Sequence, residues 1–363
     1  MREGVLFELT KDHLETGFQG VPAGYCITSH VDPKKGLSYA GRPISGLVSK
    51  TPEEVIYLLY HGEMGTKEQV AIFAEELASR STCSEEVVKQ IYALPKTNRP
   101  MDAFSAAILI AGMIEGKNDY KEDCLDLIAK IPHIAACVIN SSKGIETPSP
   151  RPELGYSESF AEMLHMGGEF ASALRLFTIL NFDHGGGNLS AFVGKAVSSS
   201  LENLYGCISS AMASLGGSRQ GGAISAGFDF VLKTAENPVE ILEALKKGAI
   251  PGFGHTILEA EDPRARICYD YCQKNFAENL LVRSAVHLRS EVLQKSHLHP
   301  NLDAISGVML HASGFVNLGT APILFGASRV VGIAIQIVYE RLFAKEGKGT
   351  PIMRPSYIYK HRT

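Results

Sequence analysis

Helix-start signals recur along most of the chain after residue 50, and they constrain the fold more than any other feature. Thr51-Pro52-Glu53-Glu54 and Thr66-x-x-Gln69 are capping boxes, in which the first and fourth side chains satisfy free backbone N–H groups. Thr82-x-x-Glu85 has the same form and predicts a third helix start. Apolar residues follow at helical spacing, and no regular alternation of strand and helix patterns occurs. The sequence therefore predicts an all-α fold.

Further helices are expected along the rest of the chain, and Pro132 is expected to bend or break one of them because proline removes a backbone donor. They are predicted over residues 100–116, 125–140, 157–167, 170–182, 200–215, 237–246, 264–294 (one or two helices) and 321–343. Short β segments are expected near the N-terminus, at 23–32 and 36–44, and the tail 347–363 is expected to be extended.

Composition excludes several classes of protein. The chain has 363 residues and a net charge of −4, so its electrostatics give no support for nucleic-acid binding. Seven cysteines form an odd set without metal-ligand spacing, and Cys268 and Cys272 are interpreted as buried thiols. We expect no metal, a reducing compartment and cytoplasmic localisation. The acidic N-terminus predicts no signal peptide, and the apolar runs are too short and too interrupted to predict a membrane span.

The segment 250–264, IPGFGHTILEAEDPR, is the strongest candidate for a binding loop. Gly252 and Gly254 let backbone approach a ligand closely, and Pro251 stiffens the entry to His255. Asp262-Pro263-Arg264 predicts a helix start, where a guanidinium beside free amides suits a carboxylate. The alternative is an ordinary capped turn with a surface histidine, and this segment alone does not decide between the two.

Three other segments carry glycines or polar residues in similar patterns. They are DHGGGN at 183–188, GGSRQGGA at 216–223 and PNLDAISG at 300–307. Each has an ordinary interpretation as well: a helix connection, a domain hinge and a helix cap, respectively.

Taken in order along the chain, these four segments, followed by Ser328-Arg329 and Arg354-Pro355, closely resemble the citrate synthase family. GLSYAGRPISGL, TPEEVIYLLYHGEM and GYSESFAEML also resemble that family's N-terminal half. The resemblance implies an all-α homodimer with a large domain, 1–220 and 316–363, and a smaller mobile domain, 221–315. Gly216–Gly222 would form part of the hinge.

The resemblance also implies two substrate sites. His184, His255, Arg264 and Arg329 would hold oxaloacetate, and Arg354 would join them from the neighbouring subunit. Arginine suits this role because its planar fork binds carboxylates and stays charged. Asp303 would be the base that deprotonates the thioester methyl group, and His255 would be the acid at the ketone. Pro251, Gly252, Phe253 and Gly254 would hold the adenine of coenzyme A.

Three positions depart from the family pattern, all on the enol and coenzyme A side. Gln220 replaces the usual histidine that donates to the thioester oxygen, although an amide can also donate. Thr256 and Glu259 stand where basic residues meet coenzyme A phosphates, and Ala40 replaces an arginine.

The predicted function is therefore condensation of an acyl-CoA with oxaloacetate or another 2-oxo acid, with coenzyme A thioester as co-substrate and no permanent cofactor. Two alternatives stay open. One is an enzyme with a changed acyl donor or reaction direction, and the other is a non-catalytic keto-acid binder.

Overall fold

The computed structural model describes residues 5–218, 220–237, 243, 248, 250–296, 298–359 and 361. Arg219 and most of the helix predicted over 237–246 lie outside the described residues. The α-helices are α1 Pro52–His61, α2 Lys67–Arg80, α3 Glu85–Ala93, α4 Pro100–Glu115, α5 Tyr120–Lys143, α6 Tyr156–Met163, α7 Glu169–Asn181, α8 Leu189–Ser198, α9 Leu204–Leu215, α10 Ala223–Glu236, α12 Pro263–Asn275, α13 Leu280–Ser296, α14 Ser306–Ala312 and α15 Ala321–Leu342. The 3-10 helices are η1 Lys11–Glu15, η2 Ile44–Gly46, η3 Leu302–Ala304 and η4 Leu318–Thr320. The all-α prediction is confirmed.

A small antiparallel sheet lies in the N-terminal part, as expected. It contains β1 Ser29–Asp32, β2 Gly36–Tyr39 and β3 Arg42–Pro43, in the order β1-β2-β3. Ala40 and Gly41 form the turn between β2 and β3, and both have positive φ, at 43° and 76°. Alanine is unusual in this left-handed region, so the turn places it under local strain.

The first two capping boxes form as predicted. Thr51 accepts from the amide of Glu54 at 3.2 Å, while the Glu54 carboxylate accepts from the amide of Thr51 at 2.8 Å. The third prediction is wrong by two residues, because Ser84 caps α3 and accepts from the amide of Val87. Ser84 is the better cap since it directly precedes the acidic first turn of α3.

Of the bend or break predicted at Pro132, the break is wrong, because helix α5 runs unbroken from Tyr120 to Lys143. Proline leaves the carbonyl of the residue four positions earlier without its helical donor. Here that carbonyl belongs to Ile128, and the hydroxyl of Tyr156 donates to it at 2.9 Å. The helix also begins earlier than predicted, since Asp119 caps it by accepting from the amides of Lys121 and Glu122.

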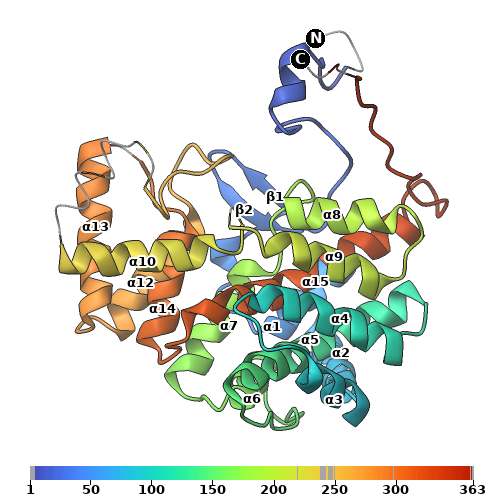
Figure 1. Cartoon of the computed structure of the whole chain (residues 1–363), viewed down its shortest axis with the longest axis horizontal. Helices are drawn as coiled ribbons and strands as arrows, with labels where there is room; N and C mark the ends of the chain where they lie inside the picture. The colour runs from blue at the N-terminus through green and yellow to red at the C-terminus, as the bar shows by residue number, and fades with distance from the viewer. Residues whose placement is uncertain are drawn as a thin grey trace.

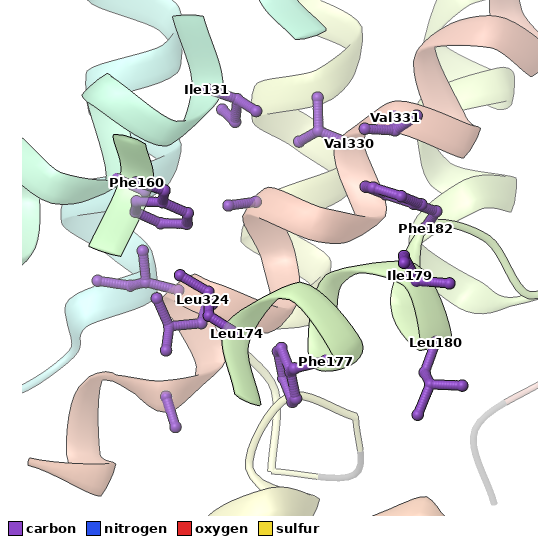
Figure 2. Close-up of a cluster of buried hydrophobic side chains, with 14 of the residues drawn as sticks. Ile131, Phe160, Leu174, Phe177, Ile179, Leu180, Phe182, Leu324, Val330 and Val331 are labelled. Carbon is purple, nitrogen blue, oxygen red and sulfur yellow. The ribbon is translucent and has the colours of Figure 1, made fainter. Parts of the chain in front are cut away.

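The core surrounds α15, which packs against α5, α7, α8 and α9. Figure 2 shows Leu324, Val330 and Val331 of α15 among apolar side chains of α5, α6 and α7. By length and composition α5 and the segment Leu318–Leu342 could cross a membrane, contrary to the expectation from the sequence. However, 94% of each such window is buried against protein, as in a core helix.

Helices α10, α12, α13 and α14 form a group of their own at one side of the molecule (Figure 1). These helices lie within 221–315, the predicted small domain, while α15 returns to the larger group. The division into a large domain and a smaller mobile one, with the hinge at Gly216–Gly222, stays a prediction. Three helices, α8, α10 and α14, were not predicted from the sequence. The two short ones, α8 and α14, are rich in small residues and Ser, which weakens their apolar periodicity.

Candidate active site

The loop before His255 and the loop before Asp303 are joined by backbone hydrogen bonds. The amide of Gly254 donates to the carbonyl of His299 at 2.8 Å, and the amide of Asn301 donates to the carbonyl of Gly252 at 2.9 Å. The Asn301 side chain also donates to the carbonyl of Gly254 at 2.8 Å. These bonds fix His255 and Asp303 on one rigid unit.

Gly252 is required for this junction. Its φ is +80°, and a Cβ there would lie 2.6 Å from the Cα of Ala304. Any other residue would push the loop away from η3, the turn that carries Asp303. Gly227 of α10 plays a similar part, because a Cβ there would lie 2.1 Å from the carbonyl oxygen of Asp303.

The carboxyl of Asp303 sits in an environment that suits a base working near neutral pH. Burial raises its pKa to about 6; nearby Asp262 adds to this effect, and Arg264 and Arg329 oppose it. A carboxylate with this pKa is ionised at pH 7 but has greater proton affinity than an exposed one. Asn301 holds the turn by accepting from the amide of Asp303 at 2.9 Å.

His255 is oriented as a hydrogen-bond donor. Its Nδ1 accepts from the amides of Ile257 and Leu258, each at 3.0 Å. The neutral ring must therefore carry its proton on Nε2. Burial, aided by Arg264, holds the pKa of His255 below its ordinary value, so the ring stays neutral at pH 7.

His184 lies beside His255, with ring centroids 5.5 Å apart. Its Nε2 is buried without a partner among the described residues. Burial, with Arg264 and Arg329 nearby, holds the pKa of His184 well below its ordinary value. Burying a polar atom without a hydrogen-bond partner costs free energy, which makes this nitrogen a candidate for binding a ligand.

The loop that carries His184 is anchored by Asp183, a buried residue that sequence reasoning did not single out. Its carboxylate accepts from Thr28, from Ser29 at 2.7 Å and from Gln336 at 2.9 Å. It also accepts from the amide of His184 at 2.9 Å, which fixes the direction of the loop. The sequence signal was the aspartate directly before His184.

Two buried arginines lie in the same electrostatic environment. Arg264 contacts Asp262 in a fork, with Nε to Oδ1 at 3.1 Å and Nη2 to Oδ2 at 2.8 Å. Burial works against its charge, but Asp262 raises the pKa of Arg264 overall. Arg329 donates from Nε to the carbonyl of Asn181 at 2.9 Å, and its Nη1 is buried without a partner among the described residues. Burial lowers the pKa of Arg329 to about 10, so it remains charged at pH 7.

The structure therefore brings five predicted site residues together, namely His184, His255, Arg264, Arg329 and Asp303. The charges of Arg264 and Arg329 act on His184 and on Asp303 alike, and the two histidine rings lie side by side. Arginine and neutral histidine donors grouped next to a carboxylate can bind a small dianion and abstract a proton beside it.

Gln220 lies against the loop of His184. Its Nε2 donates to Oδ1 of Asn188 at 2.5 Å and to Oγ of Ser190 at 3.2 Å. Its Oε1 is buried without a partner in the described part of the chain. The side chain is therefore held in place, but both of its N–H groups are occupied.

Arg354 is exposed on the C-terminal tail and does not reach this cluster within one chain. The tail contacts the body where the amide of Met353 donates to Ser199, at the C-terminal end of α8. His184 precedes the N-terminal end of α8. The two ends of this ten-residue helix are about 15 Å apart.

The segment predicted to hold coenzyme A, Pro251 to Gly254, forms the loop tied to Asn301 described above. Phe253 pairs with Pro300 in an isolated β-bridge and is buried. Glu259 is exposed, and its amide donates to the carbonyl of Pro33 at 2.9 Å. Among the described residues, no group of three or more His, Cys, Asp or Glu side chains could hold a metal ion.

Comparison with known sequences agrees with this arrangement. A family profile described as "Citrate synthase, C-terminal domain" matches residues 17–356. The mitochondrial citrate synthase of Saccharomyces cerevisiae is 28% identical, with 97% of this chain and 81% of that protein aligned. A probable mitochondrial citrate synthase of Glossina morsitans morsitans is 30% identical over 97% of this chain and 84% of its own length.

Solved structures share the fold over nearly the whole chain. Citrate synthase from Thermotoga maritima is 27% identical with a TM-score of 0.83, covering 96% of both chains. The enzyme from Pyrobaculum aerophilum is 28% identical with a TM-score of 0.84, covering 96% of this chain and 93% of its own. A ternary complex of citrate synthase from Thermoplasma acidophilum with carboxymethyl coenzyme A and oxaloacetate has a TM-score of 0.86 at 22% identity, with 96% of both chains covered, which speaks for the fold alone.

Proposed function

The chain belongs to the citrate synthase family, and we propose that it condenses acetyl-CoA with oxaloacetate to give citrate and free coenzyme A. Coenzyme A thioester is a co-substrate in such an enzyme, and no permanently bound cofactor is needed. The observation that carries the assignment of residues is the grouping of two neutral histidines and two buried arginines around a carboxylate whose pKa is about 6.

Oxaloacetate carries two carboxylates, and the unpaired donors of the site match them. We propose that this anion binds to the free Nη1 of Arg329, to the unpaired Nε2 of His184 and to the N–H groups of Arg264 that do not face Asp262. Since these groups are already fixed by Asn181, Asp262 and Asp183, binding orders few side chains.

The C–C bond forms after the thioester is deprotonated. Asp303 removes a proton from the methyl group of the thioester, and Gln220 donates a hydrogen bond to the oxygen of the resulting enolate. The enolate carbon attacks the ketone carbon of oxaloacetate, and the ketone oxygen takes the proton from Nε2 of His255. The proton held by Asp303 later replaces the one that His255 gave up. Water then cleaves the citryl thioester to citrate and the free thiol of coenzyme A.

A thiol-release assay tests the proposal. Purified protein is mixed with oxaloacetate and a panel of acyl-CoA thioesters, and free thiol is followed against a boiled control. We expect release with acetyl-CoA that Asp303→Ala abolishes and Gln220→His increases. Release with propionyl-CoA alone would instead support a changed donor, and conversion of citryl-CoA to acetyl-CoA and oxaloacetate without thiol release would support cleavage as the working direction. Oxaloacetate binding by calorimetry without turnover of any thioester would support the non-catalytic binder.

We further propose a homodimer in which Arg354 enters the site of the partner subunit. The N-terminal segment and the C-terminal tail leave the body of the protein in Figure 1 and expose large apolar side chains. Tyr25 is 84% exposed and Tyr357 is 89% exposed in the single chain. Such residues are normally covered, and a second copy of the chain offers a matching surface.

For the cellular compartment we propose the cytoplasm. All seven cysteines are unpaired and six are buried, which suits a reducing environment. Fractionation of cells that express the full natural gene with a C-terminal tag tests this, and enrichment in an oxidising compartment would refute it.

A further inference from the structure

Gln220, Asn188 and Ser190 form a closed triangle of hydrogen bonds beside the His184 loop. Gln220 Nε2 donates to Asn188 Oδ1 at 2.5 Å and to Ser190 Oγ at 3.2 Å. Ser190 Oγ in turn donates to Asn188 Oδ1 at 2.8 Å. Each pair of side chains in the triangle is joined by a hydrogen bond, but Gln220 Oε1 is buried without a partner among the described residues.

This arrangement conflicts with the role of a donor. A primary amide has two N–H groups, and both are spent on Asn188 and Ser190. The group left over is the amide oxygen, which can only accept. An enol or thioester oxygen placed against it would meet another acceptor, so this orientation cannot stabilise the developing negative charge.

The triangle has a second arrangement that satisfies the same three contacts. If both amides turn over, Asn188 Nδ2 donates to Gln220 Oε1 and to Ser190 Oγ, and the Ser190 hydroxyl donates to Gln220 Oε1. Both N–H groups of Gln220 are then free. This rotation of the two amide groups is possible only because asparagine carries a donor and an acceptor on one side chain, and because the serine hydroxyl can donate to either neighbour.

We propose that Asn188 is a positioning residue that, with Ser190, turns the Gln220 amide over so that its N–H groups face the thioester. This inference rests on the proposed function of Gln220 as the enol-oxygen donor. In the orientation described here, the orphaned Gln220 Oε1 carries a desolvation penalty. The turned orientation removes that penalty, and a thioester oxygen supplies the acceptor that the freed N–H groups then need. The bound acyl group therefore favours the turned state.

Asn188→Asp is the decisive substitution, because a carboxylate only accepts and would hold the Gln220 N–H groups away from the thioester. The fold tolerates the change, since Asn188 is the N-cap of α8 and aspartate is favoured there. We expect kcat with acetyl-CoA to fall roughly 10²–10³-fold, the effect of losing an oxyanion donor. Asn203→Asp is the matched control: it makes the same change at the N-cap of α9, outside the triangle, and kcat should stay within roughly threefold of wild type.

A double-mutant cycle separates orientation from added charge. Gln220→Ala alone should lose as much kcat as Asn188→Asp, and the double variant should lose no more than either single variant. Repulsion of oxaloacetate by the new carboxylate would instead raise the KM for oxaloacetate in both backgrounds. Additive losses in kcat, or wild-type kcat for Asn188→Asp, would overturn the proposal.

Binding of carboxymethyl coenzyme A in the presence of oxaloacetate gives a readout without turnover. This compound carries a carboxylate in place of the acetyl group of acetyl-CoA, so in the proposed site the same donor would face it. We expect calorimetry to show at least tenfold weaker binding for Asn188→Asp, with affinity for free coenzyme A unchanged. Wild-type protein that neither turns over thioesters nor binds this compound would refute the proposed function, whereas equal binding by wild type and Asn188→Asp would refute only the role of Asn188.

Discussion

Nε of Arg329 donates to the carbonyl oxygen of Asn181 at 2.9 Å, and this bond leaves Nη1 of the same guanidinium buried and unpaired. The helix α15 thus presents a fixed positive charge with a free donor toward the cluster. Tyr39 contributes to the same frame, because its hydroxyl donates to the carbonyl of Ile179 at 3.0 Å and accepts from the amide of Asp183 at 3.2 Å.

Arg329→Lys should weaken oxaloacetate binding while the protein stays folded. Lysine keeps the charge but cannot bond Asn181 and a carboxylate in the same plane. Losing one hydrogen bond to a charged group costs about 1.5–3 kcal/mol, so we expect KM for oxaloacetate to rise roughly 10–100-fold. Steady-state kinetics with varied oxaloacetate measures this.

Arg175→Lys is the control for this substitution. Arg175 also bonds backbone carbonyls, those of Val48 and Lys50 at 3.1 and 2.7 Å, but belongs to the fold and not to the proposed site. Its variant should change KM by less than threefold. Equal effects of the two variants would show that the loss at Arg329 is structural.

The pKa of Asp303 predicts the acid limb of the pH profile. A base must be deprotonated to act, and burial raises the pKa of this carboxyl to about 6. We expect kcat/KM for acetyl-CoA to be level above pH 7 and to fall tenfold per unit well below pH 6. A limb with a midpoint near 4 would show that Asp303 is not the group that titrates.

The same shift predicts that Asp303 destabilises the folded protein at neutral pH. A carboxyl whose folded pKa is raised favours folding while protonated, and this contribution is lost as pH rises through about 6. Asp303→Asn should therefore raise the free energy of unfolding at pH 7.5 by up to about 3 kcal/mol and give little gain near pH 4. Asp270→Asn, on an exposed position of α12, should change neither value, and thermal unfolding at both pH values measures the difference.

Glu259 is expected to weaken binding of coenzyme A. Family resemblance puts a basic residue there to meet a phosphate, and Glu259 is exposed at a loop fixed by the carbonyl of Pro33. Glu259→Arg should lower KM for acetyl-CoA roughly fivefold, a gain of about 1 kcal/mol typical of an exposed ion pair. The gain should shrink at high salt.

The matched control is Glu278→Arg, which makes the same change of charge at an exposed position between α12 and α13. Its KM for acetyl-CoA should match wild type. If both variants gain equally, the effect comes from net charge and not from a phosphate contact at position 259.

Local signals predicted most of the helices, and a long-range contact accounts for the error at Pro132. The capping boxes of Thr51 and Thr66 act within four residues, so the sequence alone was sufficient. The continuity of α5 through Pro132 depends on Tyr156, which lies 24 residues further along the chain, and nothing near the proline indicated it.

The same distinction holds at the site. The resemblance indicated His184, His255, Arg264, Arg329 and Asp303, and the fold brings these residues together. Their protonation could not be predicted, since it depends on burial and on charges from distant segments. The occupied N–H groups of Gln220 were also hidden, because Asn188 and Ser190 lie 32 and 30 residues earlier in the chain.

Subunit mixing tests whether Arg354 acts across a dimer interface. Asp303→Ala and Arg354→Ala chains are each expected to be nearly inactive as homodimers. In a heterodimer, the site on the Arg354→Ala chain keeps Asp303 and receives an intact Arg354 from its partner, so one of two sites is complete. Random reassociation after mild denaturation should restore roughly a quarter of wild-type activity, because about half of the dimers are mixed and half of their sites work.

The control mixes each variant only with itself through the same cycle, which should restore nothing. Sedimentation analysis of the untreated protein should show a dimer. If the mixed sample stays inactive although heterodimers form, Arg354 acts within its own chain or not at all; a monomer in solution would exclude the shared site directly.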